Sequence, residues 1–276
     1  MKKKPAKTKT KKIYVKASPP AKKPAPQGPG VSVYIVGESP MVEEFASLCS
    51  AHGYSVALSW NQPPAGSPKE LAGSARLTPN VPAGTSLAIE LTNTDAALKR
   101  ANILKLDQAL PPTAPILSSS VTVSATEQCS WISGKHRLVG ISALPTFIGK
   151  PLVETAPSVF TPKETLEPVQ RFFRSLGKEI EIVQDRVGMV LPGILCQMIN
   201  EAVFAVTEDI ADPRDIDAAV KLGIDCPFGP IEWAEKIGIN QVYAVLSAIH
   251  NDVQEERTRI APLLKQMALS SDWWKT

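Results

Sequence analysis

Residues 31–45 read VSVYIVGESPMVEEF, and this stretch decides how the first half of the chain folds. The β-branched run Val31 to Val36 predicts a buried strand, and Gly37 permits the tight turn that follows it. A helical pattern then continues to Gly53, which ends it before a second apolar run, Ser55 to Trp60. A strand, a glycine turn, a helix and a strand within about thirty residues predict the opening of a dinucleotide-binding fold.

The rest of the first half alternates between strand-like and helix-like patterns, which predicts an α/β fold with a doubly wound, mostly parallel sheet. Residues 61–85 are rich in proline, glycine and serine, and we expect an irregular connection there. The further strands are expected at residues 86–91, 115–123, 137–144 and 179–183, and the further helices at about 95–110 and 161–176.

The second half of the chain is helical in pattern. Apolar residues between 194 and 206 recur at helical spacing, which indicates one long amphipathic helix, and residues 241–256 show the same spacing. We expect helix starts at Asp212–Pro213 and Pro230, and helix ends at Gly223 and Gly238. The expected organisation is a tail over residues 1–30, an α/β domain over 31–186 and a helical domain over 187–276.

The first 30 residues differ from the rest in charge. They hold ten lysines, six prolines and no acidic residue, while the whole chain of 276 residues has a net charge of +3. The remainder, with 20 basic and 27 acidic residues, carries a net charge of −7. A segment so polar and so rich in proline forms neither a core nor a continuous helix, so we expect disorder. Two roles are open: contact with nucleic acid or an anionic surface through counterion release, and a solvated solubility tail.

Composition limits the compartment and the metal chemistry. No apolar run approaches twenty residues, so we expect no transmembrane helix. No apolar stretch follows the first lysines, and the first 30 residues contain no arginine, so we expect neither a signal peptide nor a mitochondrial presequence. The four cysteines are widely spaced and form no Cys-x-x-Cys pair, which predicts free thiols in a reducing, cytoplasmic compartment and no metal site.

The turn after the first strand departs from the glycine pattern that cradles a dinucleotide. Gly37 occupies the first glycine position, but Ser39 and Val42 stand where the second and third glycines belong. The second glycine lets the backbone approach a pyrophosphate, and the third lets the helix and the strand pack closely. Ser39 suits a helix N-cap instead, and Pro40 suits the first helical position. Gly37 and Ser39 remain the candidate cofactor contacts of this loop.

The charges of the same loop oppose a pyrophosphate. Glu38, Glu43 and Glu44 gather at the positive end of the expected helix, where they favour the helix but repel an anion. Trp60 stands at the end of the second strand, where an acidic residue should accept a hydrogen bond from the adenosine ribose. An indole donates hydrogen bonds and does not accept them. This loop therefore indicates that ordinary NAD binding is impaired.

Several motifs have the order and spacing of one enzyme family. MINEA at 198–202, DIDAAVKLG at 215–223, PFGPIE at 227–232 and PLLKQM at 262–267 come from the second half. LVE at 152–154, TPKET at 161–165 and LGK at 176–178 extend the likeness into the first half. Over about residues 31–270 the chain resembles the 3-hydroxyacyl-CoA dehydrogenases.

The resemblance implies a Rossmann-like domain followed by an all-α dimerisation domain, with the active site in the cleft between them. The family oxidises the 3-hydroxyl of an (S)-3-hydroxyacyl-CoA in fatty-acid metabolism and passes the hydride to NAD. A histidine removes the hydroxyl proton, and a glutamate orients that histidine. The ligands implied for this chain are therefore NAD and an acyl-CoA, and the implied assembly is a homodimer through the helical domain.

The resemblance assigns catalytic positions to Glu154, Ser142 and Thr122. Glu154 fills the place of the orienting glutamate, but Ser142 stands where the histidine belongs. A serine has no pKa that would let it act as a base near neutral pH. Thr122 aligns with a serine that contacts the substrate, and it keeps a hydroxyl. Pro192 replaces an asparagine that binds the substrate carbonyl, and proline offers no hydrogen-bond donor.

Other positions of the family pattern survive only in part. Lys99 matches a lysine near the cofactor, while Thr94 replaces the glutamate five residues before it and Pro145 replaces a second asparagine. The connection 61–85 is short beside the helical hairpin with which the family helps to hold coenzyme A. The remaining candidate bases, interpreted as surface or structural residues, are His52, His136 and His250.

Three functions are compatible with this pattern. The first is a 3-hydroxyacyl-CoA dehydrogenase, with activity weakened by the replaced residues. The second is a non-catalytic relative that dimerises or binds a partner through its helical domain. The third is a protein that binds nucleic acid or an anionic surface through its lysine tail. We place the second above the first as a statement of present activity, and the first is the statement of ancestry.

Overall fold

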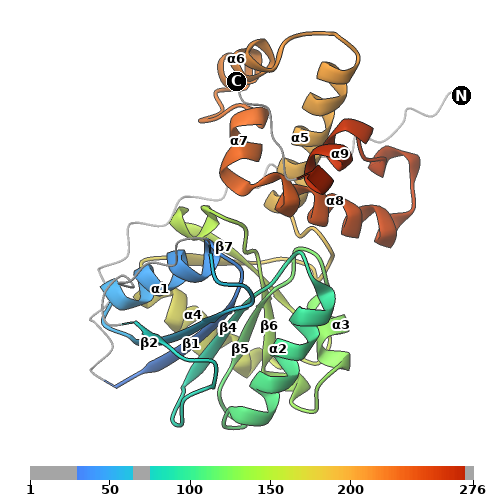
Figure 1. The fold of residues 1–276 in the computed structure, drawn as a ribbon. Coiled ribbons are helices and arrows are strands. Elements are labelled where there is room, and N and C mark those ends of the chain that lie inside the picture. Colours follow the sequence, from blue (N-terminus) through green and yellow to red (C-terminus); the bar gives the residue numbers. More distant parts are fainter. Residues whose placement is uncertain (1–29, 65–74, 271–276) are drawn as a thin grey trace, which may run out of the picture.

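The computed structural model describes residues 30–64 and 75–270. It consists of a sheet part, which holds all the described strands and ends with β8 at Ile182, and a helical part, which begins with α5 at Leu191. The helical part stands over the ends of the strands at one side of the sheet (Figure 1). The predicted disorder of residues 1–30 falls almost entirely on residues outside the described ranges. In the described part of the chain, no helix is both long enough and apolar enough to cross a membrane.

The sheet has the strand order β3-β2-β1-β4-β5-β6-β7-β8. All neighbouring strands are parallel except β6 and β7, which are antiparallel. The prediction of a doubly wound, mostly parallel sheet is thus confirmed. The strand bounds are β1 Ser32–Gly37, β2 Ser55–Trp60, β3 Arg76–Leu77, β4 Leu87–Leu91, β5 Ile116–Ser119, β6 Leu138–Ile141, β7 Leu152–Pro157 and β8 Glu179–Ile182.

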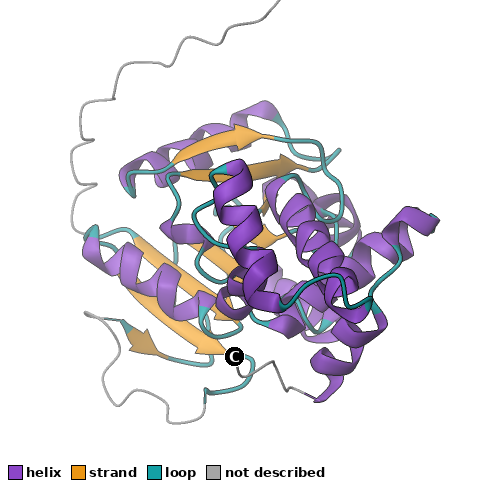
Figure 2. Cartoon of the chain, turned by 90° about the horizontal axis from the view of Figure 1, so that it is seen from above, coloured by secondary structure: helices purple, strands orange, loops and turns teal. Residues whose placement is uncertain are grey.

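Helices cover both faces of the sheet, as Figures 1 and 2 show. Because side chains alternate along a strand, Val33 and Ile35 of β1 share a core with α1 (Met41–Ala51) and α4 (Lys163–Ser175). Tyr34 and Val36 point to the other face, into a core with α2 (Ala96–Ala109) and α3 (Ala125–Ser130). The β-branched run that predicted a buried strand is therefore buried on both faces.

Three segments of the sheet part differ from the sequence prediction. The expected strand 115–123 ends at Ser119, and Ser124 caps a helix that the prediction missed: its hydroxyl accepts the Glu127 N–H at 3.2 Å. Strand β7 was not expected, and it runs back along β6 with Ile141 opposite Thr155. The connection 61–85 contains the short strand β3 in its described portion.

The chain reverses its winding at β1, with β2 on one side of it and β4 on the other. In open sheets of this kind, the crevice beyond the carboxyl ends of the two strands at the reversal is the usual place for a ligand. Here those ends are Gly37 of β1 and Leu91 of β4, which lie opposite each other in the parallel register. The helical part stands over this edge (Figure 1).

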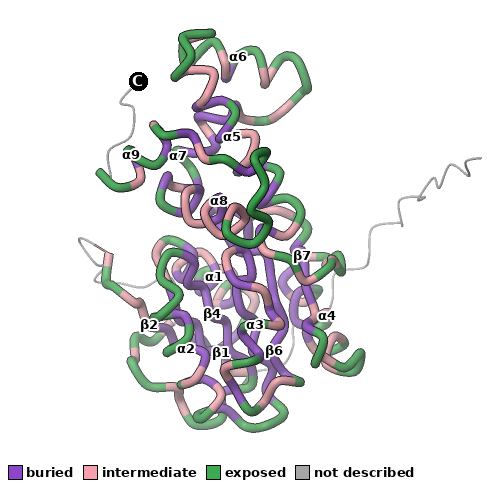
Figure 3. The backbone as a smooth tube through the Cα atoms, turned by 90° about the vertical axis from the view of Figure 1, so that its right-hand side faces the viewer, coloured by how far each residue is buried: buried purple, intermediate pink, exposed green. Residues whose placement is uncertain are grey.

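The helical part forms its own apolar core. Ile199, Val203, Trp233, Val242 and Leu246 are buried in it, and Val121, Leu144 and Phe147 of the sheet part join the same cluster. Figure 3 shows the buried residues running from the sheet into these helices. The helices are α5 Leu191–Thr207, α6 Pro213–Ile224, α7 Pro230–Ile237, α8 Ile239–Val253 and α9 Pro262–Ser270, and the short 3-10 helices are Lys135–Arg137, Phe147–Gly149 and Glu256–Thr258.

Two predicted helix boundaries had different outcomes. Gly238 ends α7 with φ 90°, as expected. Gly223, expected to end α6, lies inside that helix, and Asp225 ends it in the left-handed conformation with φ 54°. Aspartate tolerates this conformation better than most residues, so it can take the place that glycine usually holds.

Residues 183–188, the link between the two parts, form hydrogen bonds with the sheet part along their length. The Val183 N–H donates to the Thr155 carbonyl at 3.0 Å, and the Gly188 N–H donates to the Val121 carbonyl at 2.9 Å. Between them, the Asp185 carboxylate accepts two N–H groups at the start of α3, each at 2.7 Å. The link is therefore fixed to β7, to the start of α3 and to the segment that follows β5.

We expect Gly37→Ala to destabilise the protein by about 1–3 kcal/mol, because overpacking a tight backbone contact has costs of this order. A Cβ at this position would lie 2.5 Å from the Leu91 carbonyl carbon, and the φ of 149° is unfavourable for a side chain. Chemical denaturation measures the change. Gly149→Ala is the control, since nothing lies within 4 Å of its added Cβ. Equal stabilities of the two variants would contradict the expectation.

Candidate functional site between the sheet and the helical part

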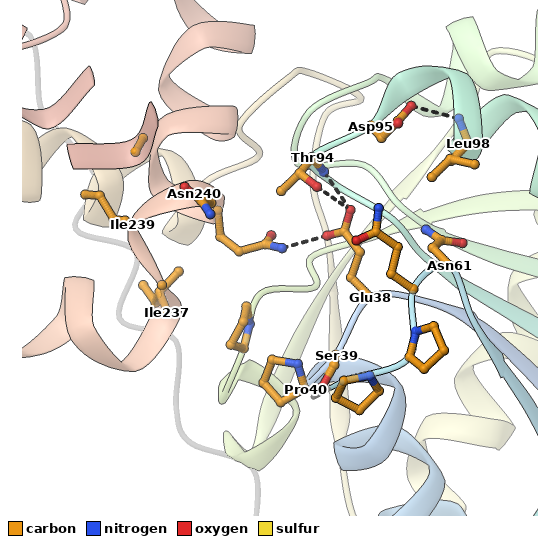
Figure 4. A pocket seen from close by; sticks show the side chains of 17 residues that line it. Glu38, Ser39, Pro40, Asn61, Thr94, Asp95, Leu98, Ile237, Ile239 and Asn240 are labelled. Atoms are coloured by element: carbon orange, nitrogen blue, oxygen red, sulfur yellow. Dashed lines mark hydrogen bonds between the residues drawn. The ribbon is translucent and has the colours of Figure 1, made fainter. Parts of the chain in front are cut away.

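A cavity of about 770 Å³ lies where the chain reverses its winding, between the ends of β1 and β4 and the α7–α8 turn. Figure 4 shows the side chains that line it. Among the described residues, the lining includes the carboxylates Glu38 and Asp95 and no basic side chain. The other lining residues are Ser39, Pro40, Asn61, Gln62, Pro63, Pro64, Thr94, Leu98, Pro145, Ile237, Gly238, Ile239, Asn240, Gln241 and Ala268.

The side chain of Glu38 reaches from the β1–α1 turn across the end of the sheet (Figure 4). One carboxylate oxygen accepts the Thr94 N–H at 2.9 Å and the Thr94 hydroxyl at 2.7 Å. The other oxygen accepts the side-chain N–H of Gln241, at the start of α8, at 2.6 Å. A single carboxylate thus joins β1, the turn before α2 and the helical part.

A buried chain of amides and hydroxyls continues from this carboxylate. The Asn93 amide donates to the Gln241 side-chain oxygen at 2.8 Å and to the Ala143 carbonyl at 2.9 Å. The Ser119 hydroxyl in turn donates to the Asn93 side-chain oxygen at 2.6 Å. Asn93 is 5% exposed and Gln241 is 8% exposed, so water does not compete for these bonds.

A second cavity, of about 650 Å³, lies on the other side of these contacts. Its lining includes Thr122, Tyr243 and Ser247, and it shares Thr94 and Asn240 with the first cavity. The two cavities therefore meet at Thr94 and Asn240, of which Thr94 is a hydrogen-bond partner of Glu38.

The structure brings Ser142 and Glu154 together. The Ser142 N–H donates to the Glu154 carbonyl at 2.9 Å, and the Glu154 N–H donates to the Ser142 hydroxyl at 3.2 Å. Both residues are 7% exposed, and neither is among the residues that line the two cavities. Thr122 lines the second cavity instead, so the three predicted catalytic residues do not face one common space.

The Glu154 carboxylate is fully engaged at the start of α5. Its two oxygens accept the Val190 N–H at 2.9 Å and the Leu191 N–H at 2.7 Å. The first N–H groups of a helix have no partner within the helix, and a carboxylate there also benefits from the helix dipole. The next residue, Pro192, has no N–H to satisfy. Glu154 therefore accepts the N–H groups of Val190 and Leu191, and Pro192 adds no N–H that needs a partner.

Lys99, the predicted cofactor contact of α2, lies within the protein interior. Its side-chain ammonium is 2.5 Å from the Glu90 carboxylate, and the two side chains are 1% and 0% exposed. The Ser118 hydroxyl also donates to Glu90, at 2.9 Å. A buried ion pair with an added hydrogen bond is self-sufficient, so Lys99 has a structural partner in place of a ligand. Its contact with a cofactor stays a prediction.

Of the two candidate cofactor contacts in this loop, Ser39 lines the first cavity and Gly37 does not, and Ser39 does not cap α1. The helix begins at Met41, after Pro40, and no side chain caps it. The reason is that backbone carbonyls take the first N–H groups: Val42 donates to Glu38 and Glu44 donates to Pro40. The Glu44 carboxylate faces away from the helix end and accepts the Thr146 N–H at 2.9 Å. Burial raises the pKa of Glu44, although that hydrogen bond opposes the shift.

The three histidines lie away from both cavities. His52 follows α1, where its ring bonds the Leu48 carbonyl at 2.9 Å, and His250 of α8 bonds the Thr258 hydroxyl at 3.0 Å. His136 is exposed, in the 3-10 helix before β6. The four cysteines are free thiols, and burial raises the pKa of Cys49 and Cys196 to about 12. The described residues thus offer no thiolate or imidazole to the cleft.

A nicotinamide dinucleotide does not fit the residues that stand at the expected position. Glu38 belongs to the β1–α1 turn, at which a dinucleotide-binding fold holds a pyrophosphate, and its carboxylate adds a negative charge there. The described lining residues supply two carboxylates and no cation to balance a doubly charged ligand. Trp60, at the end of β2, keeps its indole N–H buried without a partner and has no acceptor for a ribose hydroxyl.

The fold and the cleft define a class of protein: a Rossmann-like sheet joined to a helical part that stands over the carboxyl ends of its central strands. Residues 188–273 match the family described as 3-hydroxyacyl-CoA dehydrogenase, C-terminal domain. Together with the relatives below, this match makes the chain a relative of the 3-hydroxyacyl-CoA dehydrogenases, as its motifs predicted.

Two curated relatives are similar in sequence. The chain is 30% identical over 182 residues to a 3-hydroxybutyryl-CoA dehydrogenase of Bradyrhizobium diazoefficiens, which covers 66% of this chain and 62% of that protein. It is 29% identical over 180 residues to a probable 3-hydroxybutyryl-CoA dehydrogenase of Bacillus subtilis, covering 65% of this chain and 63% of that protein. The matched region thus spans a little under two thirds of these relatives' length.

Two solved structures share the fold. One is the (S)-3-hydroxybutyryl-CoA dehydrogenase PaaH1 of Ralstonia eutropha, with a TM-score of 0.72, 24% identity and coverage of 87% of this chain and 94% of that one. The other is FadB2 of Mycobacterium tuberculosis, with a TM-score of 0.76, 21% identity and coverage of 88% and 95%. The two-part architecture is therefore that of these proteins.

The sequence prediction missed the partners of Glu38. It noted the charge of this residue as an obstacle to phosphate, but Gln241 lies 203 positions away and no local pattern links the two. Asn93 carried one weak signal, as a polar residue at the end of an apolar strand that faces the crevice.

We expect Glu154→Gln to destabilise the protein by about 1–3 kcal/mol, because one oxygen that accepts a helix N–H is replaced by an amide that cannot accept. Thermal and chemical denaturation measure the loss. Glu181→Gln is the matched control, since Glu181 lies opposite Glu154 in the β7–β8 register and is exposed. If both variants lost the same stability, the helix-capping role would be wrong.

Proposed function

We propose that this chain is a non-catalytic relative of the 3-hydroxyacyl-CoA dehydrogenases. The observation that carries the proposal is the state of Glu154: both carboxylate oxygens are engaged by the start of α5, beside a serine at the position of the base. Each oxygen accepts one N–H of the helix start, which gives this carboxylate a structural role, and Ser142 offers no imidazole for it to orient.

The rate contributions that such missing groups usually make support a loss of turnover. A general base typically contributes 10²–10⁴-fold, and a donor to the developing oxyanion about 10²–10³-fold. Ser142 lacks the first function, and Pro192 lacks the second. If the two losses are independent, the combined reduction is on the order of 10⁴-fold or more.

The alternative is a 3-hydroxyacyl-CoA dehydrogenase of weak activity, dependent on NAD and acting in fatty-acid metabolism. The names of the relatives favour it, as does the cavity that persists between the two parts. The position of Glu38 is the strongest observation against it, because this carboxylate adds a negative charge to the turn at which a dinucleotide-binding fold holds the coenzyme phosphates. The lysine tail supports a third role, in binding nucleic acid or an anionic surface, and salt-dependent binding that disappears on deletion of residues 1–30 would favour that role.

Wild-type protein is expected to show no saturable NADH oxidation with acetoacetyl-CoA and no thermal stabilisation by NADH or NADPH. The physical reason is the absence of a base together with the acidic lining of the cleft. A spectrophotometric assay and a thermal-shift titration are the measurements, with a catalytically active 3-hydroxybutyryl-CoA dehydrogenase as the positive control. Saturable turnover by the wild type would overturn the proposal and favour the weak dehydrogenase.

The retained role that we propose is assembly of two copies through the helical part. Leu222 and Ile224 of α6 and Ile210 before it are 87%, 69% and 69% exposed, and α6 is largely exposed in Figure 3. Three large apolar side chains exposed on one helix and its approach are typical of a contact surface. A second copy is the occupant that the resemblance to dimerising dehydrogenases implies.

We expect Leu222→Lys to shift the protein from dimer to monomer, because a charged side chain would be buried at the interface. Light scattering coupled to gel filtration measures the mass. Leu77→Lys is the control, since Leu77 is 55% exposed on β3, in the sheet part. A wild-type protein that is monomeric at micromolar concentration would contradict this role.

A further inference from the structure

Three uncharged donors converge on the Glu38 carboxylate. They are the backbone N–H and the hydroxyl of Thr94 and the side-chain N–H of Gln241, at 2.9, 2.7 and 2.6 Å. In the described part of the chain, no lysine or arginine forms an ion pair with Glu38. An anion held by neutral donors from two separate elements is the arrangement of an oxyanion-binding site.

The site is preorganised by the residues behind it. Gln241 is 8% exposed, and its side-chain oxygen accepts the Asn93 amide, so its N–H must face Glu38. Asn93 is itself fixed by the Ser119 hydroxyl and the Ala143 carbonyl. The Gln241 amide therefore presents a donor at this point with or without Glu38.

The site lies between the two parts of the protein, so its hydrogen bonds connect them. Glu38 comes from the sheet and Gln241 from α8, so their hydrogen bond joins the two parts across the cleft (Figure 4). The cavities on the two sides both include Thr94 and Asn240 in their linings. The contact thus lies beside the two residues at which the cavities meet.

We propose that Glu38 is a built-in anionic ligand: its carboxylate fills an oxyanion-binding site formed by Thr94 and Gln241 and so holds α8 against the sheet. The proposal deepens the proposed function and rests on it, since a cleft closed by the chain's own carboxylate needs no coenzyme to hold the two parts together. A phosphate oxygen is the chemical equivalent of the group that Glu38 supplies. Removal of Glu38 should therefore leave a site for inorganic phosphate.

The first test is a double-mutant cycle on stability with Glu38→Ala, Gln241→Ala and the double variant. A direct charge-assisted hydrogen bond predicts that the two changes are not additive, with a coupling of about tenfold or more in the unfolding equilibrium constant. The control cycle pairs Glu43→Ala with Gln241→Ala. Glu43 is an acid of the same helix start, and one of its carboxylate oxygens is buried without a partner. Additivity in both cycles would overturn the proposal.

The second test uses inorganic phosphate as the probe, at constant ionic strength set with chloride. Glu38→Ala should gain a saturable rise in melting temperature with phosphate, and the wild type and the Glu38→Ala/Gln241→Ala double variant should not. Equal responses of all three proteins would overturn the proposal. If Glu38→Ala fails to fold, Glu38→Gln keeps the shape and removes the charge, and its coupling to Gln241→Ala should fall below that of the wild-type carboxylate.

The outcomes separate this proposal from the proposed function. Saturable oxidation of NADH by the wild type would overturn the non-catalytic role, whatever the stability cycle shows. Additive effects of Glu38→Ala and Gln241→Ala, together with no oxidation of NADH by the wild type, would overturn the proposal that Glu38 is a built-in ligand. The non-catalytic role would then remain.

Discussion

The junction between the two parts of this protein depends on carboxylates that accept backbone and amide N–H groups. Glu154 accepts two N–H groups at the start of α5, and Glu38 accepts those of Thr94 and Gln241. Such bonds are directional, and their loss leaves a charge or a donor unpaired in a half-buried place. The orientation of the helical part over the sheet edge follows from them and from the apolar cluster beneath.

Ser142 and Pro192, which stand where the family has a histidine and an asparagine, are compatible with the hydrogen bonds that Glu154 makes at this junction. Ser142 is small enough to sit against the β7 backbone, with its hydroxyl accepting the Glu154 N–H. Pro192 is the second residue of α5, where the missing N–H of proline leaves no donor unpaired, and Glu154 accepts the two N–H groups before it. A glutamate that would orient a base is thus a helix-capping residue here.

Local pattern was sufficient for most of the fold and insufficient for the site. Gly37, the alternation in β1 and the helix-ending Gly238 act through their own neighbours, so their roles can be predicted from sequence. The direction of a long side chain depends on what the fold brings near it. Glu38 bonds to Gln241, 203 positions away, and Lys99 of α2 forms an ion pair with Glu90 of β4. Strand β7 was missed for a similar reason, since its buried positions do not alternate.

The link between the two parts also determines how the cleft can respond to a ligand. Many two-part proteins open and close by rotation about a few loosely held residues, which absorb the change in backbone angles. Here Val183, Asp185 and Gly188 are bonded to β7, to the start of α3 and to Val121, so four hydrogen bonds oppose a rotation about this segment. A rotation that widened the cleft would work against these bonds as well as against the contact between Glu38 and Gln241.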